Sequence, residues 1–292
     1  MNYVNFIIPL LLLTLMACKQ QTDSADAYGN FEAIEVIVSA ESSGRIISFL
    51  PVEGAALQTG QVAVNIDTTQ LYLQKLSLES GFASLSSRIH TLDAQLRSIE
   101  VQLDNLIREK KRVDKLVEGG AATSKQQDDI NGQVSLLEAQ MVATASQKDA
   151  VYAERLTLNA QIGQVENQIN KCAVSNPIDG ILLTKYKEQG EMAVPGQPLF
   201  KMANMEELIL RAYVSGDQLS SIKTGGSVTV SFDKVHDLQQ TTGVVSWISP
   251  RAEFTPKIIQ TREERVNLVY AIKVMVPNDG SLKIGMPGEV IF

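Results

Sequence analysis

The stretch VSAESSGRIISFLPVEGAALQTGQ, residues 38–61, returns in altered form as VSNPIDGILLTKYKEQGEMAVPGQ, residues 174–197. The two segments match at a constant offset of 136 residues, and each contains three glycines at the same spacing. These glycines are Gly44, Gly54 and Gly60 in the first copy and Gly180, Gly190 and Gly196 in the second. Glycines between short apolar runs are typical of tight turns that need a positive φ. Each copy is therefore predicted to form short strands that cannot bury their own apolar face, so the two copies must pair.

The residues between the two copies, 68–172, carry apolar side chains at alternating spacings of four and three. This period of 3.5 indicates a coiled coil, and a return arm with the same spacing runs from Ile130 to Cys172. Polar residues interrupt the return arm at Thr144, Lys148 and Arg155, which predicts a looser middle. The predicted seam of the first arm is Leu78, Phe82, Leu85, Ile89, Leu92, Leu96, Ile99, Leu103, Leu106, Lys110, Val113 and Val117. An arm of roughly 50 residues would reach about 75 Å.

A glycine-containing turn separates the two arms. Gly119 and Gly120 are expected to end the first helix, and Thr123 or Ser124 to cap the second, with Gln126 or Gln127 completing a capping box. Ahead of this turn, Arg112 and Leu116 lie four residues apart and share a helix face outside the seam. The insertion is therefore predicted to be an antiparallel helical hairpin whose tip presents these two side chains.

The remaining segments predict a barrel and an export signal. After Asn204 the sequence changes to short alternating strands with a capped short helix at 215–222, which suggests a small antiparallel barrel. At the N-terminus, an apolar run too short to span a bilayer ends in Leu-Met-Ala-Cys18. This ending resembles a bacterial lipobox, whose cysteine is acylated. The polar residues 19–30 are then expected to form a flexible tether.

Composition excludes several classes of function. The formal net charge of −7 disfavours nucleic-acid binding, because such proteins need a basic face. The sequence has no P-loop, zinc-protease or serine-hydrolase motif, and its two histidines, His90 and His236, suit neither a triad nor a metal site. We therefore expect no enzyme activity, no metal and no nucleic-acid partner.

Taken together, these motifs resemble the HlyD-like membrane fusion proteins, which are periplasmic adaptor subunits. The doubled glycine pattern resembles the lipoyl or biotinyl domain, but the insertion removes the turn that would hold a carrier lysine, so no cofactor is expected. The resemblance implies an α+β multidomain fold: a long antiparallel coiled-coil hairpin inserted in a lipoyl-like β-sandwich, followed by a small antiparallel β-barrel. The expected domains are a signal peptide at 1–17, a lipid-anchored tether and first strand at 18–35, half-motif 1 at 36–67, the hairpin at 68–172 with its tip at about 112–129, half-motif 2 at 173–204, and the barrel at 205–292.

The same resemblance implies partners. Arg112, Leu116 and Thr123 match the hairpin-tip arginine, leucine and serine that engage a TolC-like outer-membrane channel, with threonine here in place of serine. A second segment is similar to one found in adaptors of ABC-type exporters and would face the inner-membrane transporter. Its residues are Phe254, Thr255, Pro256, Arg262 and Arg265. Family members commonly form hexameric rings, and an acylated Cys18 would hold this chain to a membrane in the periplasm of a Gram-negative bacterium, with the inner membrane favoured.

Alternatives remain open for several of these assignments. The segment around Phe254 could be a solvated surface loop, and Thr123 and Arg112 could serve in capping and solvation alone. The partner could be a proton-driven RND pump rather than an ABC permease. The protein could also be a structural envelope lipoprotein that spaces two membranes without any transporter.

Overall fold

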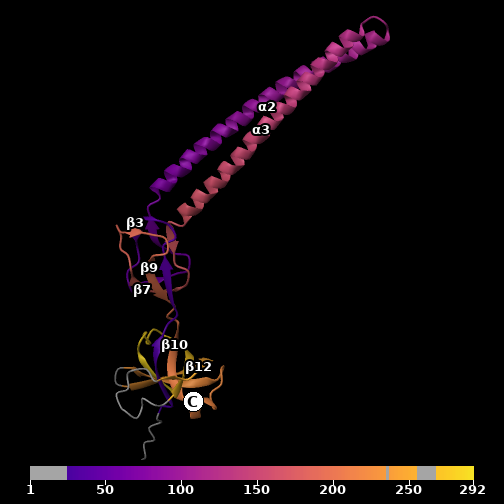
Figure 1. Cartoon of the computed structure of the whole chain (residues 1–292). Coiled ribbons are helices and arrows are strands. Elements are labelled where there is room, and N and C mark those ends of the chain that lie inside the picture. Colours follow the sequence, from indigo (N-terminus) through magenta and orange to yellow (C-terminus); the bar gives the residue numbers. More distant parts are fainter. Residues whose placement is uncertain (1–24, 235–236, 255–267) are drawn as a thin grey trace, which may run out of the picture.

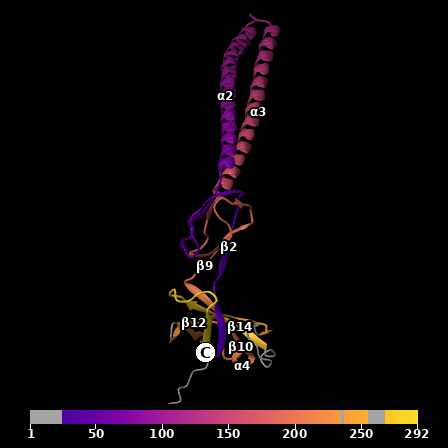
Figure 2. The same cartoon turned by 90° about the vertical axis from the view of Figure 1, so that its left-hand side faces the viewer.

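The computed structural model describes residues 25–234, 237–254 and 268–292. The chain forms an elongated molecule in which a barrel, a sandwich and a helical hairpin follow one another along its length (Figures 1 and 2). The expected fold class is confirmed. Within the described residues, no helix combines the length and apolar character needed to cross a lipid bilayer.

The hairpin consists of α2 (Thr69–Glu118) and α3 (Ser124–Asn170), which run side by side for most of their length (Figure 1). Every predicted seam residue of α2 is buried or half-buried, and Ile89, Leu92 and Ile99 are the buried ones. Seam positions on α3 behave in the same way, with Val151 and Val165 buried. The 3.5-residue period therefore places one apolar stripe of each helix against the other, as in other coiled coils.

Two of the three polar interruptions in the return arm contact the opposite helix. Lys148 of α3 forms an ion pair with Asp93 of α2, with Nζ and Oδ1 2.7 Å apart, and this hydrogen bond lowers the pKa of Asp93 and raises that of Lys148. The guanidinium of Arg155 lies 5.6 Å from the ring centroid of Phe82. Lys148 and Arg155 thus find partners on the opposite helix, whereas the hydroxyl of Thr144 donates to the carbonyl of Gln140 on its own helix. The long stems of lysine and arginine also cover apolar surface while their heads stay solvated.

The sandwich is built from both copies of the repeat. Its sheets have the strand orders β2-β9-β7-β4 and β6-β5-β3-β8, so each sheet mixes strands from the two copies. The strands are β2 (Glu35–Ser39), β3 (Gly44–Phe49), β4 (Ala56–Leu57), β5 (Val62–Ile66), β6 (Ala173–Ser175), β7 (Gly180–Lys185), β8 (Met192–Ala193) and β9 (Pro198–Ala203). The predicted pairing of the copies is therefore confirmed, and neither copy closes a core alone.

Equivalent hydrogen bonds join the copies in both directions. The amide of Gly54 donates to the carbonyl of Leu182 at 2.8 Å, and the amide of Gly190 donates to the carbonyl of Ile46 at 2.9 Å. Gly190 is the equivalent of Gly54 in the second copy, and Ile46 is the equivalent of Leu182 in the first. The second bond is therefore the same as the first, with the donor copy and the acceptor copy exchanged. The two half-motifs are thus related by an approximate two-fold axis.

The repeated glycines serve two different purposes. Gly54, Gly60, Gly190 and Gly196 have φ between 80° and 94°, as predicted for turns. Gly180 has no positive φ, so its prediction as a turn residue is wrong. It begins β7, and a Cβ at this position would lie within 2.8 Å of the carbonyl carbon of Ala203.

The equivalent Gly44 also begins a strand rather than forming a turn. Its φ of 157° is close to extended backbone, and a Cβ there would lie 2.7 Å from Cγ2 of Ile66. At the first glycine of each copy, close packing against another strand of the sandwich therefore decides the residue type. The turn prediction fails at both positions for this reason.

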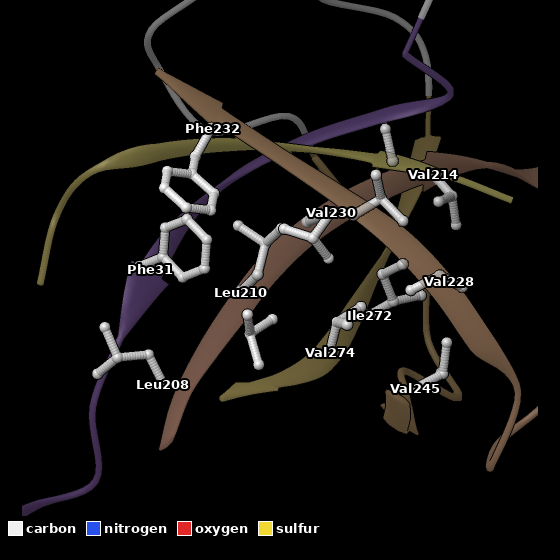
Figure 3. Close-up of a cluster of buried hydrophobic side chains, with 14 of the residues drawn as sticks. Phe31, Leu208, Leu210, Val214, Val228, Val230, Phe232, Val245, Ile272 and Val274 are labelled. Carbon is white, nitrogen blue, oxygen red and sulfur yellow. The ribbon is translucent and has the colours of Figure 1, made fainter. Parts of the chain in front are cut away.

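The barrel is a closed ring of six strands, β10-β1-β15-β11-β12-β14, in which β14 pairs back onto β10 and the short β13 lies outside on β14. Its elements are β1 (Ala27–Glu32), β10 (Glu207–Ser215), α4 (Gly216–Leu219), β11 (Ser227–Lys234), β12 (Asp237–Ile248), β13 (Glu253–Phe254), β14 (Leu268–Pro277) and β15 (Pro287–Ile291). Inward-facing residues of all six strands fill the core, where Phe31 and Phe232 meet edge to face with ring centroids 6.2 Å apart (Figure 3).

The N-terminal strand β1 corrects the predicted tether. Residues 27–30 were expected to be flexible, but they belong to β1, which lies between β10 and β15. Ala27 and Phe31 point into the barrel core, and a Cβ at Gly29 would overlap the backbone of Arg211. From β1 the chain passes through the sandwich to the hairpin tip and returns through both β domains.

Candidate functional site at the hairpin tip

The end of α2 is fixed by a Schellman motif. The amide of Ala121 donates to the carbonyl of Leu116 at 2.7 Å, and the amide of Gly120 donates to that of Val117 at 3.0 Å. Gly120 has a φ of 72°, the left-handed conformation that this motif requires. The last carbonyls of the helix are thereby satisfied, and the chain turns at once toward the second helix.

The start of α3 is fixed by a capping box. The amide of Gln126 donates to Oγ1 of Thr123 at 3.4 Å, and the amide of Thr123 donates to Oε1 of Gln126 at 2.8 Å. The sequence allowed Thr123 or Ser124 as the cap and Gln126 or Gln127 as its partner. The structure selects the pair Thr123 and Gln126.

Gln127 has a different role, which the sequence did not predict. Its Nε2 donates to Oδ1 of Asp114 on the opposite helix at 2.8 Å, so it joins the two arms just below the turn. Asp114 and Gln127 lie on either side of a predicted tight turn. Their spacing about that turn was the feature of the sequence that could have indicated this contact. With both caps and this cross-arm bond, the tip is held in one geometry without a partner. A rigid tip loses less conformational freedom when it binds.

Arg112 and Leu116 stand outside this network and point to solvent. The side chain of Arg112 is 71% exposed and pairs with Glu109 at 2.7 Å on its own helix. Leu116 is 44% exposed, although its backbone carbonyl accepts hydrogen bonds from the amides of Ala121 and Ala122. Thr123 is exposed as well, with its hydroxyl at the cap. The structure therefore brings all three predicted residues to the tip, where they present a cation, an apolar group and a hydroxyl.

The other predicted residues lie elsewhere or outside the described residues. Phe254 is 77% exposed at the end of β13 and belongs to the barrel, which lies at the opposite end of the molecule from the hairpin tip (Figure 1). Cys18 and the segment 255–267, which contains Thr255, Pro256, Arg262 and Arg265, lie outside the described residues. The tip and the barrel are thus two separate candidate contact sites.

Comparison with known proteins supports the fold. No family model matches the chain. A UPF0194 membrane protein of Yersinia enterocolitica is 26% identical over 330 residues, which cover 100% of this chain and 99% of the relative. Another, from the asrC 5' region of Acidithiobacillus ferridurans, is 25% identical over 293 residues, which cover 90% of this chain and 85% of the relative.

Two solved structures share the architecture. MacA from Actinobacillus actinomycetemcomitans gives a TM-score of 0.61 at 19% identity, with 90% of this chain and 76% of MacA covered. The membrane fusion protein Spr0693 from Streptococcus pneumoniae R6 gives a TM-score of 0.52 at 16% identity, with 90% of this chain and 96% of Spr0693 covered. The chain has the fold of the membrane fusion proteins, as its sequence resemblance predicted.

Proposed function

We propose that this protein is a non-catalytic periplasmic adaptor that connects an inner-membrane transporter to an outer-membrane channel of the TolC type. The observation that carries the proposal is the pre-organised tip at one end of a rod whose other end is a compact barrel (Figure 2). The fold shared with MacA and Spr0693 supports the same assignment. A rod with two separate contact sites serves to link two partners rather than to catalyse a reaction.

At the tip, each of the three exposed side chains has a distinct task. Leu116 enters an apolar pocket between helices of the channel, because an exposed leucine gains most when a partner removes it from water. Arg112 pairs with a channel carboxylate or helix C-terminus, and the hydroxyl of Thr123 adds a hydrogen bond. The caps keep these groups in place before the channel arrives.

At the other end, the barrel rests on the transporter. Phe254 and the segment that contains Thr255, Pro256, Arg262 and Arg265 face the transporter, for which an ABC permease is favoured by the sequence of this segment. An acylated Cys18, nine residues before the first residue of β1 in the sequence, holds the chain at the inner membrane. Copies of the chain assemble into a ring, with six as the expected number, so that cargo passes through a closed duct.

Affinity purification from crosslinked cells tests the adaptor assignment. A tagged chain is expected to copurify with a permease whose subunits carry an ATP-binding cassette, while cells with the untagged chain give the background. Recovery of a proton-driven permease instead would overturn the ABC assignment but keep the adaptor. Recovery of no permease would favour the structural envelope lipoprotein and contradict the proposal.

A further inference from the structure

A groove on the outer face of the barrel is unrelated to the hairpin tip. It encloses about 530 Å³, which is within the range of small-molecule sites. Four adjacent strands contribute one continuous row of its lining, because Tyr213 pairs with Tyr28, Tyr28 with Glu289, and Glu289 with Ser231. These side chains all lie on the face of the sheet opposite to the core residues.

Two residues of the groove carry a buried polar atom without a hydrogen-bond partner among the described residues: Oγ of Ser231 and Nε of Arg211. Ser231 is only 3% exposed, and its Oγ has no hydrogen-bond partner among the residues that the structure describes. An unsatisfied buried hydroxyl destabilises the fold, so such groups are rare unless a ligand or water completes them. The hydroxyl therefore marks a position where a bound molecule would be stabilised.

Charges in the groove favour a cation. The carboxylates of Glu32, Asp233 and Glu289 line it, whereas Arg211 is the cationic side chain among the described lining residues. That arginine already pairs with Glu253, 3.3 Å away. The described part of the lining is thus negative overall, which raises the local concentration of positively charged ligands.

The aromatic rings of the groove also favour a cationic ligand. The guanidinium of Arg211 lies 5.9 Å from the ring centroid of Tyr213, so one tyrosine already interacts with a cation. The neighbouring ring of Tyr28 is 59% exposed and available to a ligand. Leu238 and Val269 extend the apolar part of the lining.

We infer that this groove binds an organic cation with an aromatic or otherwise apolar body. The cation lies near Glu289 and the face of Tyr28, while the body covers the apolar side chains. A polar substituent reaches the Ser231 hydroxyl. The chain then holds a small molecule by itself, in addition to linking membranes. This binding needs neither a channel nor a transporter, so its test is independent of the proposed docking.

Two ions of the same shape and opposite charge test the inference. Equilibrium dialysis of the full-length chain in detergent measures the binding of tetraphenylphosphonium and of tetraphenylborate, with a detergent-only chamber as background. Tetraphenylphosphonium is expected to bind, and Glu289→Gln and Tyr28→Ala are each expected to weaken it by about fivefold or more. Glu207→Gln, which removes an exposed carboxylate of the barrel outside the groove, is the matched control and leaves binding unchanged.

Either of two results would overturn the inference. Equal uptake of the two ions, or tetraphenylphosphonium binding that is the same in wild type, Glu289→Gln and Tyr28→Ala, means that the groove has no such site. Because each variant changes one outward-facing side chain, unchanged thermal melting confirms that lost binding comes from the groove.

Discussion

Cells that carry Leu116→Asp in place of the wild-type chain are expected to lose export and to accumulate cargo as a deletion strain does. The substitution leaves the seam intact, because Leu116 lies outside it. A carboxylate near a helix C-terminus costs about 0.3–1 kcal/mol, so Tm is expected to fall by about 2–4 °C at most. Burying that charge unpaired against a channel costs several kcal/mol, which weakens docking by more than about a hundredfold.

The matched control is Val101→Asp, which places the same charge on another exposed apolar residue of α2. Val101 lies fifteen residues before Leu116, about 22 Å further from the tip along the helix. This variant is expected to keep export. Circular dichroism of both variants confirms equal helicity. Normal export by Leu116→Asp, or equal loss in both variants, contradicts a contact specific to the tip.

Gly180→Ala is expected to destabilise the sandwich by about 3 kcal/mol, the upper end of typical overpacking effects. The added Cβ would overlap the carbonyl of Ala203, which belongs to the backbone and cannot rotate away. The two strands, β7 and β9 of the second copy, would have to separate.

The buried thiol of Cys172 reports on this domain alone, since its side chain belongs to the sandwich core. Its labelling rate, followed by peptide mass spectrometry, is expected to rise about a hundredfold in Gly180→Ala. The control is Gly163→Ala, in the interior of α3 with open space around the position. That change is expected to stabilise its helix by about 0.5–1 kcal/mol. Labelling of Gly180→Ala at the wild-type rate would refute the packing role.

Much of the architecture follows from local sequence patterns. The period of 3.5 predicts the hairpin because each seam residue contacts a neighbour whose position the repeat itself determines. The 136-residue offset predicts the paired copies, since neither has enough apolar residues for a core. The cap was predicted to within one residue, as Thr123 or Ser124 with Gln126 or Gln127, because a capping box involves only four consecutive residues.

Features that depend on distant residues were missed. A first strand within residues 18–35 was predicted, but its place in the barrel was not, because β1 has few buried residues and its partners β10 and β15 lie more than 170 residues away along the chain. The close approach at Gly180 comes from Ala203, and the partner of Lys148 is Asp93 on the opposite helix. The groove is formed by side chains from several strands, which no local pattern groups together.

The candidate docking site was predicted only in part from the sequence. The sequence placed Arg112, Leu116 and Thr123 at the tip, and the structure adds the bond between Asp114 and Gln127 that holds the arms together. Whether a channel binds there depends on the surface of another protein, which this sequence does not contain.

Photo-crosslinking from both ends of the rod in intact cells tests the linking role most directly. A photoreactive amino acid is placed at Leu116 in one strain and at Phe254 in another, since both side chains are exposed. Position 116 is expected to capture an outer-membrane channel and position 254 an inner-membrane transporter. Capture of one and the same membrane protein from both positions would contradict an adaptor that spans between two partners.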